Sequence, residues 1–241
     1  MENTIYIGLS RLSALQEHMS LIANNIANIN TPGYKANKIL FSEYLDKPKG
    51  MKETISMVLD YGNYRVKDNG PIKRTGNQLD IALEGNGYLG VQGPNNQRFY
   101  TRNGSFSLNA QNQLVTQQGY PVLDAGGQPI VFAEGVSDIV IDESGSIGTK
   151  DGTIGALMVE EFDNINTLTP VGNSLYKTDE TGKPSPKTKV LQGAIEGSNT
   201  QGVLEMTDMI DVSRNYQSVA RMLQAEHDRV RATIRSLTGN S

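Results

Sequence analysis

Two segments, one near each end of the chain, carry apolar residues at alternating steps of three and four. The first series is Leu12, Leu15, Met19, Ile22, Ile26 and Ile29. The second comprises Val203, Met206, Ile210, Leu223, Val230, Ile234 and Leu237. This spacing places an apolar stripe along a helix, and such stripes pack by inserting side chains of one helix between those of another. The sequence therefore predicts two terminal helices, buried against each other or against other copies of the chain.

The first helix is predicted to begin at a cap formed by Asn3 or Thr4 and to end near Asn28. It ends there because Pro32 and Gly33 follow, and the residue before a proline avoids helical geometry. Its last turns contain Asn24, Asn25 and Asn28. Asparagine is a poor helix former because its amide competes for backbone hydrogen bonds. These amides indicate either a fraying helix end or specific bonds to a neighbouring subunit.

The second helix is predicted to follow a capping box at Ser198 and Gln201 and to continue to about Leu237. Acidic residues lie near its start and arginines near its end, which is the order that the helix dipole favours. A long helix is therefore expected at the end of the chain.

The middle of the chain alternates short β-prone runs with glycine turns. The predicted strands are Leu79–Leu83, Tyr88–Val91, Phe106–Leu108, Ile130–Phe132, Val136–Ile141 and Ile154–Glu160. Turn dipeptides such as Asn86-Gly87 and Asn103-Gly104 separate them. Strands at such spacing predict one compact antiparallel domain.

Between the first helix and these strands, residues 35–76 lack sustained periodicity and contain nine Lys and Arg against five Asp and Glu. Ile39–Leu45 is predicted as one or two helical turns, and Val58–Val66 as an extended chain bent at Gly62. A charged stretch of this kind is usually a solvated face, and contact with an acidic surface is the alternative.

The predicted fold class is α+β: terminal α-helices forming a coiled-coil-like helical domain, a central all-β domain and an extended linker region. Five segments follow from this assignment. They are an N-terminal helix (1–30), an extended bracing segment (31–75), the β domain (76–180), a return linker (181–202) and a C-terminal helix (203–241). The linker is expected to lack an apolar face, because residues 181–187 are rich in turn-forming residues and stiffened by two prolines.

The composition excludes several classes of protein. A net charge of −4 argues against nucleic-acid binding, which requires a dense basic face. The chain has no cysteine, so disulfides, thiolate metal sites and cysteine nucleophiles are excluded. No apolar run approaches the roughly 20 residues of a membrane-spanning helix. A cleaved signal peptide is not expected either, because Glu2 occupies the region where basic residues belong, so any export uses another route.

The glycine pattern Gly85–Gly90 resembles a dinucleotide-binding turn. That motif must open a helix, whereas a further strand is predicted after Gly90. It also requires an acidic residue about 20 positions later, and the residue at that distance is Ala110. The two histidines, His18 and His227, lie on different predicted helices, and no nucleophile, histidine and acid can be grouped. We therefore expect no cofactor, no metal site and no enzymatic activity.

The aromatic residues of the predicted β domain include Tyr88, Phe99, Tyr100 and Phe106. Such residues most often form the core of a sheet. The alternative is a platform for sugars, which would make the chain a carbohydrate-binding module.

Several blocks of sequence resemble one known family. They are Ala23–Lys35, Gly76–Ala82, Tyr100–Phe106, Gly193–Thr200 and Arg214–Ser218. Together they are similar to the bacterial flagellar rod and hook family, and the resemblance extends over nearly the whole chain. Within that family, the opening Glu2–Tyr6 and the chain length are most similar to proximal-rod members, with a distal-rod subunit as the alternative.

The resemblance implies a structural subunit of the flagellar basal body, located in the rod in the periplasm. It implies export through the flagellar type III apparatus, self-assembly through the terminal helices, and contact with copies of itself and with other rod proteins. It also implies proximity to peptidoglycan. The predicted assembly interface comprises Leu12, Leu15, Met19, Ile22, Asn24, Asn25, Ile26, Asn28, Ile29, Pro32, Gly33, Tyr34, Val203, Met206, Ile210, Asn215, Tyr216, Gln217, Leu223, Val230, Ile234 and Leu237.

Overall fold

The computed structural model describes residues 2–46, 55–136, 138–150 and 152–238. They form two compact units. The helical unit comprises Met1–Ala27, Asn37–Tyr64 and Gln201–Ser241, and the β unit comprises Asn28–Ala36 and Arg65–Thr200. The predicted α+β class is confirmed, because two terminal helices enclose a β-rich middle in the sequence.

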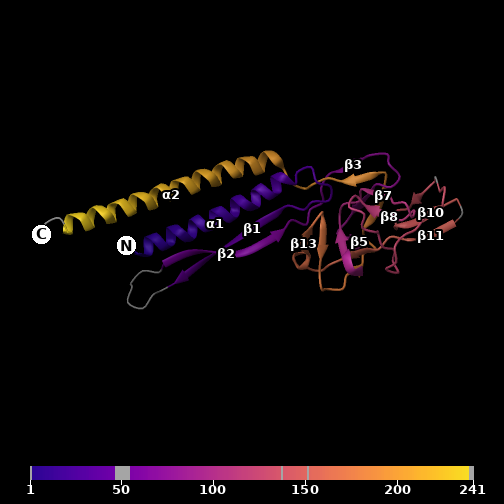
Figure 1. Cartoon of the computed structure of the whole chain (residues 1–241), viewed down its shortest axis with the longest axis horizontal. Helices are drawn as coiled ribbons and strands as arrows, with labels where there is room; N and C mark the ends of the chain where they lie inside the picture. The colour runs from indigo at the N-terminus through magenta and orange to yellow at the C-terminus, as the bar shows by residue number, and fades with distance from the viewer. Residues whose placement is uncertain (1, 47–54, 137, 151, 239–241) are drawn as a thin grey trace. The chain divides into compact units, whose positions relative to one another are not determined.

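The helical unit contains two helices and a two-stranded sheet. Helix α1 spans Glu2–Ala27 and α2 spans Gly202–Thr238. The two helices lie side by side and run in opposite directions, so the start of α1 and the end of α2 lie at the same end of the pair (Figure 1). Strands β1 (Asn37–Asp46) and β2 (Ile55–Arg65) pair with each other, and β1 contacts α1. The helical turns predicted at Ile39–Leu45 are therefore wrong, whereas the extended chain at Val58–Val66 is largely confirmed.

We call the contact between α1 and α2 the helix seam. On α1, the residues of the predicted stripe, which are Leu12, Leu15, Met19, Ile22 and Ile26, are all buried or half-buried, and Ala14 and Leu21 are buried as well. The α2 side of the seam comprises Met209, Val212, Tyr216, Val219, Leu223 and Val230, again at steps of three and four or their sum. Gly8 lies against Leu223 so closely that an added Cβ would be 2.6 Å from its Cδ2. The helices thus pack on each other within one chain.

The β unit is built from short antiparallel strands. A six-stranded sheet has the order β13-β14-β6-β5-β12-β15, and a three-stranded sheet has the order β11-β10-β9. The remaining strands form the pairs β16-β4, β17-β3 and β7-β8. The strands up to β10 are β3 Ile72–Arg74, β4 Ile81–Glu84, β5 Tyr88–Gln92, β6 Arg98–Thr101, β7 Phe106–Leu108, β8 Leu114–Thr116, β9 Val140–Ile141 and β10 Ser146–Thr149. The others are β11 Gly152–Ala156, β12 Val159–Glu161, β13 Thr169–Gly172, β14 Leu175–Lys177, β15 Lys183–Pro184, β16 Lys189–Gln192 and β17 Ala194–Glu196.

Three predicted features of the middle of the chain need correction. The strand expected at Ile130–Phe132 forms only an isolated bridge, between Gln113 and Val131. The strand expected at Ile154–Glu160 is divided between β11 and β12. The return linker contributes β15, β16 and β17, so residues 183–196 belong to the packed β unit rather than to a free connector.

Two apolar clusters form the core of the β unit. The larger is centred on Ile81, Leu89, Phe106, Leu114 and Ile147. The smaller comprises Tyr88, Tyr100, Phe162, Ile165, Leu168 and Tyr176. The rings of its four aromatic residues meet edge to face. Tyr88 and Tyr100 are therefore core residues, as the more common interpretation expected, and they cannot form a sugar platform.

The glycine motif at Gly85–Gly90 turns directly from β4 into β5, so it opens a strand and not a helix. Gly85 has a positive φ of 135° and lies against Thr188. The structure therefore explains these glycines by close packing of strands. Neither described helix combines the length and the hydropathy that a membrane-spanning segment needs.

Candidate functional site

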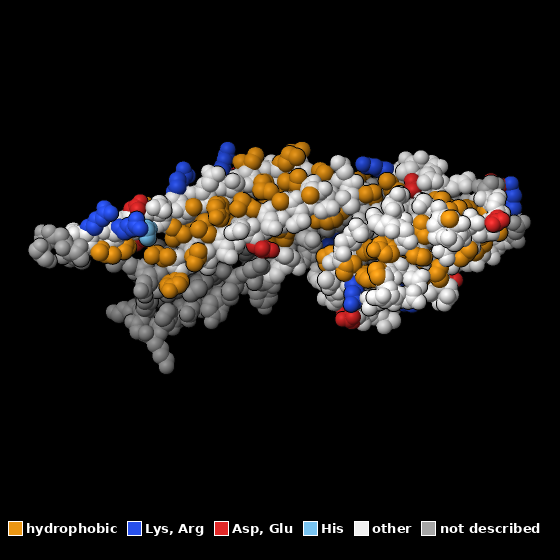
Figure 2. All heavy atoms as spheres, viewed as in Figure 1, with side chains coloured by type: hydrophobic (Ala, Val, Ile, Leu, Met, Phe, Trp, Pro, Cys, Tyr) orange, Lys and Arg blue, Asp and Glu red, His pale blue; other side chains and the backbone are white. Residues whose placement is uncertain are grey.

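The first turns of α2 present an exposed apolar stripe, which we call the outer stripe: Val203, Met206 and Ile210. Their exposed fractions are 80%, 54% and 53%. They lie beside the seam residues on the same helix, displaced around its axis by about one residue position. Figure 2 shows hydrophobic side chains gathered along the surface of the helical unit. This stripe is exposed, in contrast to the buried and half-buried apolar residues of the same helix.

A second exposed patch lies at the beginning of α1. It consists of Ile5, Tyr6 and Leu9, with Tyr6 64% and Leu9 58% exposed. Ile5 and Leu9 are four residues apart and therefore share a face of the helix. Both helices thus bury one apolar face against each other and leave a second one open to solvent.

The structure separates the predicted α2 interface residues into two sets. Tyr216, Leu223 and Val230 are half-buried in the helix seam. Val203, Met206, Ile210, Asn215, Gln217 and Ile234 are exposed. The side chain of Leu237 lies outside the described residues. The assembly role of both sets stays a prediction.

Asn25 connects three elements of the helical unit, although it was expected either to fray or to bind a neighbour. Its Nδ2 donates to the carbonyl of Asn37 at 2.9 Å and to Oε2 of Glu205 at 3.1 Å. The backbone N–H of Asn37 donates back to Asn25 Oδ1 at 3.1 Å. The side chain is only 1% exposed. Asn25 therefore holds α1 to β1 and α2, and the fraying interpretation is wrong at this position.

The other residues of the asparagine-rich block and of the turn after it have varied surroundings. Asn24 is exposed and donates to the carbonyl of Ser20, and Asn28 accepts a hydrogen bond from Thr31. In the β unit, Ile29, Pro32 and Tyr34 are half-buried and Gly33 is buried. A role of these residues in assembly stays a prediction.

In the β unit, a second constellation was not anticipated: a buried charge cluster of Lys35, Asn69, Arg102 and Glu196. Lys35 Nζ donates to Glu196 Oε1 at 2.8 Å and to Asn69 Oδ1 at 2.9 Å. It also donates to the carbonyl of Asp68 at 2.9 Å. The side chains of Lys35 and Glu196 are 3% and 0% exposed.

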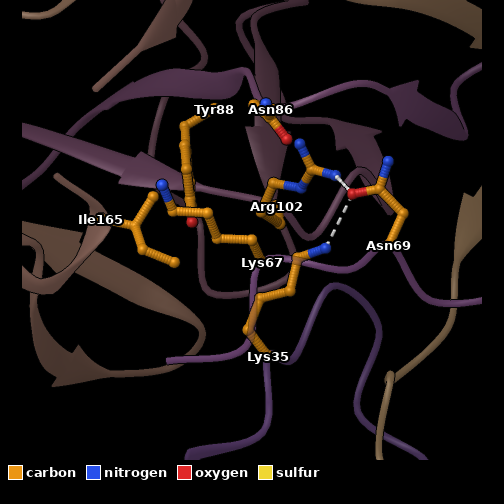
Figure 3. Close-up of a pocket in the computed structure, with 7 residues that line it drawn as sticks. All are labelled: Lys35, Lys67, Asn69, Asn86, Tyr88, Arg102 and Ile165. Carbon is orange, nitrogen blue, oxygen red and sulfur yellow. Dashed lines mark hydrogen bonds between the residues drawn. The ribbon is translucent and has the colours of Figure 1, made fainter. Parts of the chain in front are cut away.

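Arg102, which directly follows strand β6, is the second cation of the cluster. Its Nε donates to Glu196 Oε2 at 2.9 Å, and its Nη2 donates to Asn69 Oδ1 at 2.7 Å. Its Nη1 donates to the carbonyls of Gly85 and Gly87. Figure 3 shows Lys35 and Arg102 converging on Asn69. The cluster therefore holds two buried cations and one carboxylate.

Lys35, Arg102 and Glu196 each lie in a different block of the family resemblance. Charged residues are rarely buried without partners, so charged residues inside the family blocks are candidates for a buried cluster. Which of them pair with each other depends on the fold. Burial first, and then the nearby Arg102 guanidinium, lower the pKa of Lys35 to about 8, while Glu196 opposes the shift. The adjoining cavity of about 10 Å³ has room for roughly one water molecule.

Gly33 lets the chain approach this cluster. Its φ of 69° is in the left-handed region, its N–H donates to the carbonyl of Glu196 at 2.9 Å, and an added Cβ would lie 2.4 Å from the carbonyl carbon of Arg102. We expect Gly33→Ala to destabilise the chain by more than the roughly 1–2 kcal/mol of left-handed strain alone. Urea unfolding would measure the loss.

Gly76→Ala is the matched control, because Gly76 has a φ of 75° and no atom within 4 Å of the added Cβ. It isolates the cost of the backbone conformation. Equal losses in the two variants would show that the close approach to Arg102 contributes nothing.

Comparisons with known proteins agree with these observations. Three family models match: "Flagella basal body rod protein" at residues 5–35, "Flagellar hook protein FlgE/F/G D1 domain" at 82–149, and "Flagellar basal body rod FlgEFG protein C-terminal" at 191–236. The flagellar basal-body rod protein FlgF of Caulobacter vibrioides is 34% identical over 98% of both chains. The chain belongs to the flagellar basal-body rod protein family. The predicted family resemblance is confirmed, and so is the expectation of a structural protein rather than an enzyme.

Other members of the family support a FlgF-like assignment. FlgF of Rhizobium meliloti is 31% identical over the full length of both chains. FlgG of Buchnera aphidicola is 31% identical over 91% of this chain and 94% of its own. The charge cluster joins residues within or beside segments that the family models match, since Lys35 lies in the first, Arg102 in the second and Glu196 in the third.

Proposed function

We propose that this chain is a structural subunit of the flagellar basal-body rod that assembles through its terminal helices into the periplasmic drive shaft. The observation that carries the proposal is the outer stripe. The two helices already bury one apolar face on each other, yet Val203, Met206 and Ile210 remain more than half exposed at helical spacing. Burial of large apolar side chains contributes about 1.5–3 kcal/mol each, so a stripe of three provides a strong contact for another subunit.

The partners that fit are copies of this chain and other rod proteins with the same kind of helices. A helix stripe is best covered by a second stripe at the same spacing, because knobs and holes then match along the contact. Delivery by the flagellar type III export apparatus and a position near peptidoglycan are part of this proposal.

Between rod members, the proximal-rod protein FlgF is the preferred identity. The FlgF relatives align from end to end at similar length, while the FlgG relatives align over about nine tenths of this chain. A distal-rod role is the alternative. The carbohydrate-binding alternative is not favoured, because the tyrosines that it needs are buried.

The test uses cells that lack the gene for this chain. We expect them to be non-motile and to regain motility when a tagged chain is supplied, with the tag recovered in purified basal bodies at the rod. Complete basal bodies and normal swimming in the deleted strain would overturn the proposal. Labelling at the hook or filament, and not at the rod, would overturn the location.

A further inference from the structure

The charge cluster places a buried lysine amine in contact with both a side-chain amide and a carboxylate. Lys35 Nζ lies 2.9 Å from Asn69 Oδ1 and 2.8 Å from Glu196 Oε1. The amide carbon Cγ of Asn69 is one bond beyond Oδ1. An amine beside an amide carbon and a proton acceptor is the arrangement that nucleophilic substitution at an amide needs.

We propose that Lys35 and Asn69 form an intramolecular amide cross-link with release of ammonia. This inference goes beyond the rod function and does not depend on it. Each of the four cluster residues has a defined part in the reaction, and no oxidant, metal or cofactor takes part.

The steps balance in atoms and charge. The neutral form of Lys35, which has given one proton to solvent, attacks Cγ of Asn69 after a small rotation of the lysine. A new Cγ–Nζ bond forms, Glu196 accepts the proton that Nζ then gives up, and Glu196 passes it to Nδ2 as the Cγ–Nδ2 bond breaks and ammonia leaves. The ammonia takes up a proton from solvent, so the net change converts one ammonium group and one primary amide into one secondary amide and an ammonium ion.

Arg102 stabilises the charge that develops during this reaction. Its Nη2 donates to Asn69 Oδ1 at 2.7 Å, so the oxygen that becomes negative already faces a fixed guanidinium. Glu196 is 0% exposed and touches the amine directly, which suits a general base. The lowered pKa of Lys35, about 8, makes a larger share of neutral amine available than at an ordinary lysine.

The charge balance favours the product. Before the reaction two cations share one buried carboxylate, and a buried charge without its own partner is costly. The cross-link removes the charge of Lys35 and leaves one arginine for one glutamate. Asn69 is exposed on its other side, so ammonia can leave to solvent.

The experiment is mass spectrometry of the full-length purified chain under denaturing conditions. We expect a mass lower than the sequence mass by one ammonia. Trypsin should leave Lys35 uncut and release one branched peptide, in which residues 12–38 are joined to residues 68–73. The unmodified sequence mass would overturn the proposal.

Variants separate the cross-link from other reactions of the Asn69-Gly70 pair. Lys35→Arg keeps the positive charge but cannot attack, so the full sequence mass is expected, with circular dichroism to check folding. Lys67→Arg, an exposed lysine beside the same cavity, should leave the mass loss unchanged. Ammonia loss that persists in Lys35→Arg would identify a succinimide instead, and a gain in mass would identify simple deamidation. Either result would overturn the cross-link.

The rate adds a readout that a purely structural cluster would not give. For a chain collected in denaturant and then refolded, we expect the cross-linking rate to rise about tenfold per pH unit until the pH reaches about 8, because the neutral amine is the nucleophile. Glu196→Gln should slow the reaction at every pH, since the proton acceptor is lost. A rate independent of pH would contradict attack by Lys35.

Discussion

Ile210→Asp is expected to stop incorporation of the chain into the rod while leaving the free chain folded. Ile210 is 53% exposed in the outer stripe, so an aspartate there remains hydrated in the free chain, and its stability should change by less than about 0.5 kcal/mol. In the assembled rod the same carboxylate would be buried without a partner. The lost burial of isoleucine alone removes about 1.5–3 kcal/mol, and the buried carboxylate adds several more.

The measurement combines urea unfolding of the purified variant with recovery of the tagged chain in basal bodies. Ser218→Asp on the same helix is the matched control, because Ser218 is exposed and lies outside the stripe. Ile22→Asp would not be informative, because Ile22 is 2% exposed and its replacement destabilises the helix seam itself. Normal incorporation of Ile210→Asp would remove the outer stripe from the proposed interface.

The sequence could not say which apolar face of each helix meets the other, because both helices carry more than one. On α1 one stripe of apolar residues continues from Leu12 to Ile26, and Ile5, Tyr6 and Leu9 are exposed near its start. On α2 apolar residues occupy two neighbouring faces, one starting at Val203 and one at Met209. Periodicity identifies both faces but cannot say which one meets α1, because that choice depends on the partner surface.

The strand β1 was missed for a related reason. Ile39, Leu40, Tyr44 and Leu45 are spaced so that they fit both a helical and an extended period over a short run. Pairing with β2, which begins at Ile55, decides in favour of a strand, and pairing between separate segments is not visible in local periodicity.

The charge cluster could not be predicted from the sequence alone. Lys35, Arg102 and Glu196 could each be recognised as polar residues inside a family block. Their convergence requires Gly33 to turn, β17 to pair with β3, and Gly70 to donate its N–H to Glu196 at 3.0 Å. These are tertiary contacts between positions that are far apart in the sequence. A single sequence, taken by itself, does not indicate which of its residues meet in the fold.

Arg102→Met is expected to be among the most destabilising single substitutions in the β unit, with a loss of about 3–5 kcal/mol of unfolding free energy. Arg102 is 1% exposed and its guanidinium bonds to Glu196, Asn69 and two backbone carbonyls. Methionine fills a similar volume but leaves the carbonyls of Gly85 and Gly87 without these donors. The prediction holds whether or not Lys35 is cross-linked, because Glu196 depends on Arg102 in both forms.

Arg98→Met is the matched control, since Arg98 begins β6, which Arg102 directly follows; its side chain is 44% exposed and pairs with Glu160 at 3.6 Å. Exposed pairs of this kind contribute about 0–1 kcal/mol because water screens them and two long side chains must be ordered. Urea unfolding of both variants, followed by circular dichroism, measures the difference. Similar small losses in both would mean that Glu196 is stabilised without Arg102, and the cluster would then not be what holds the three family segments together.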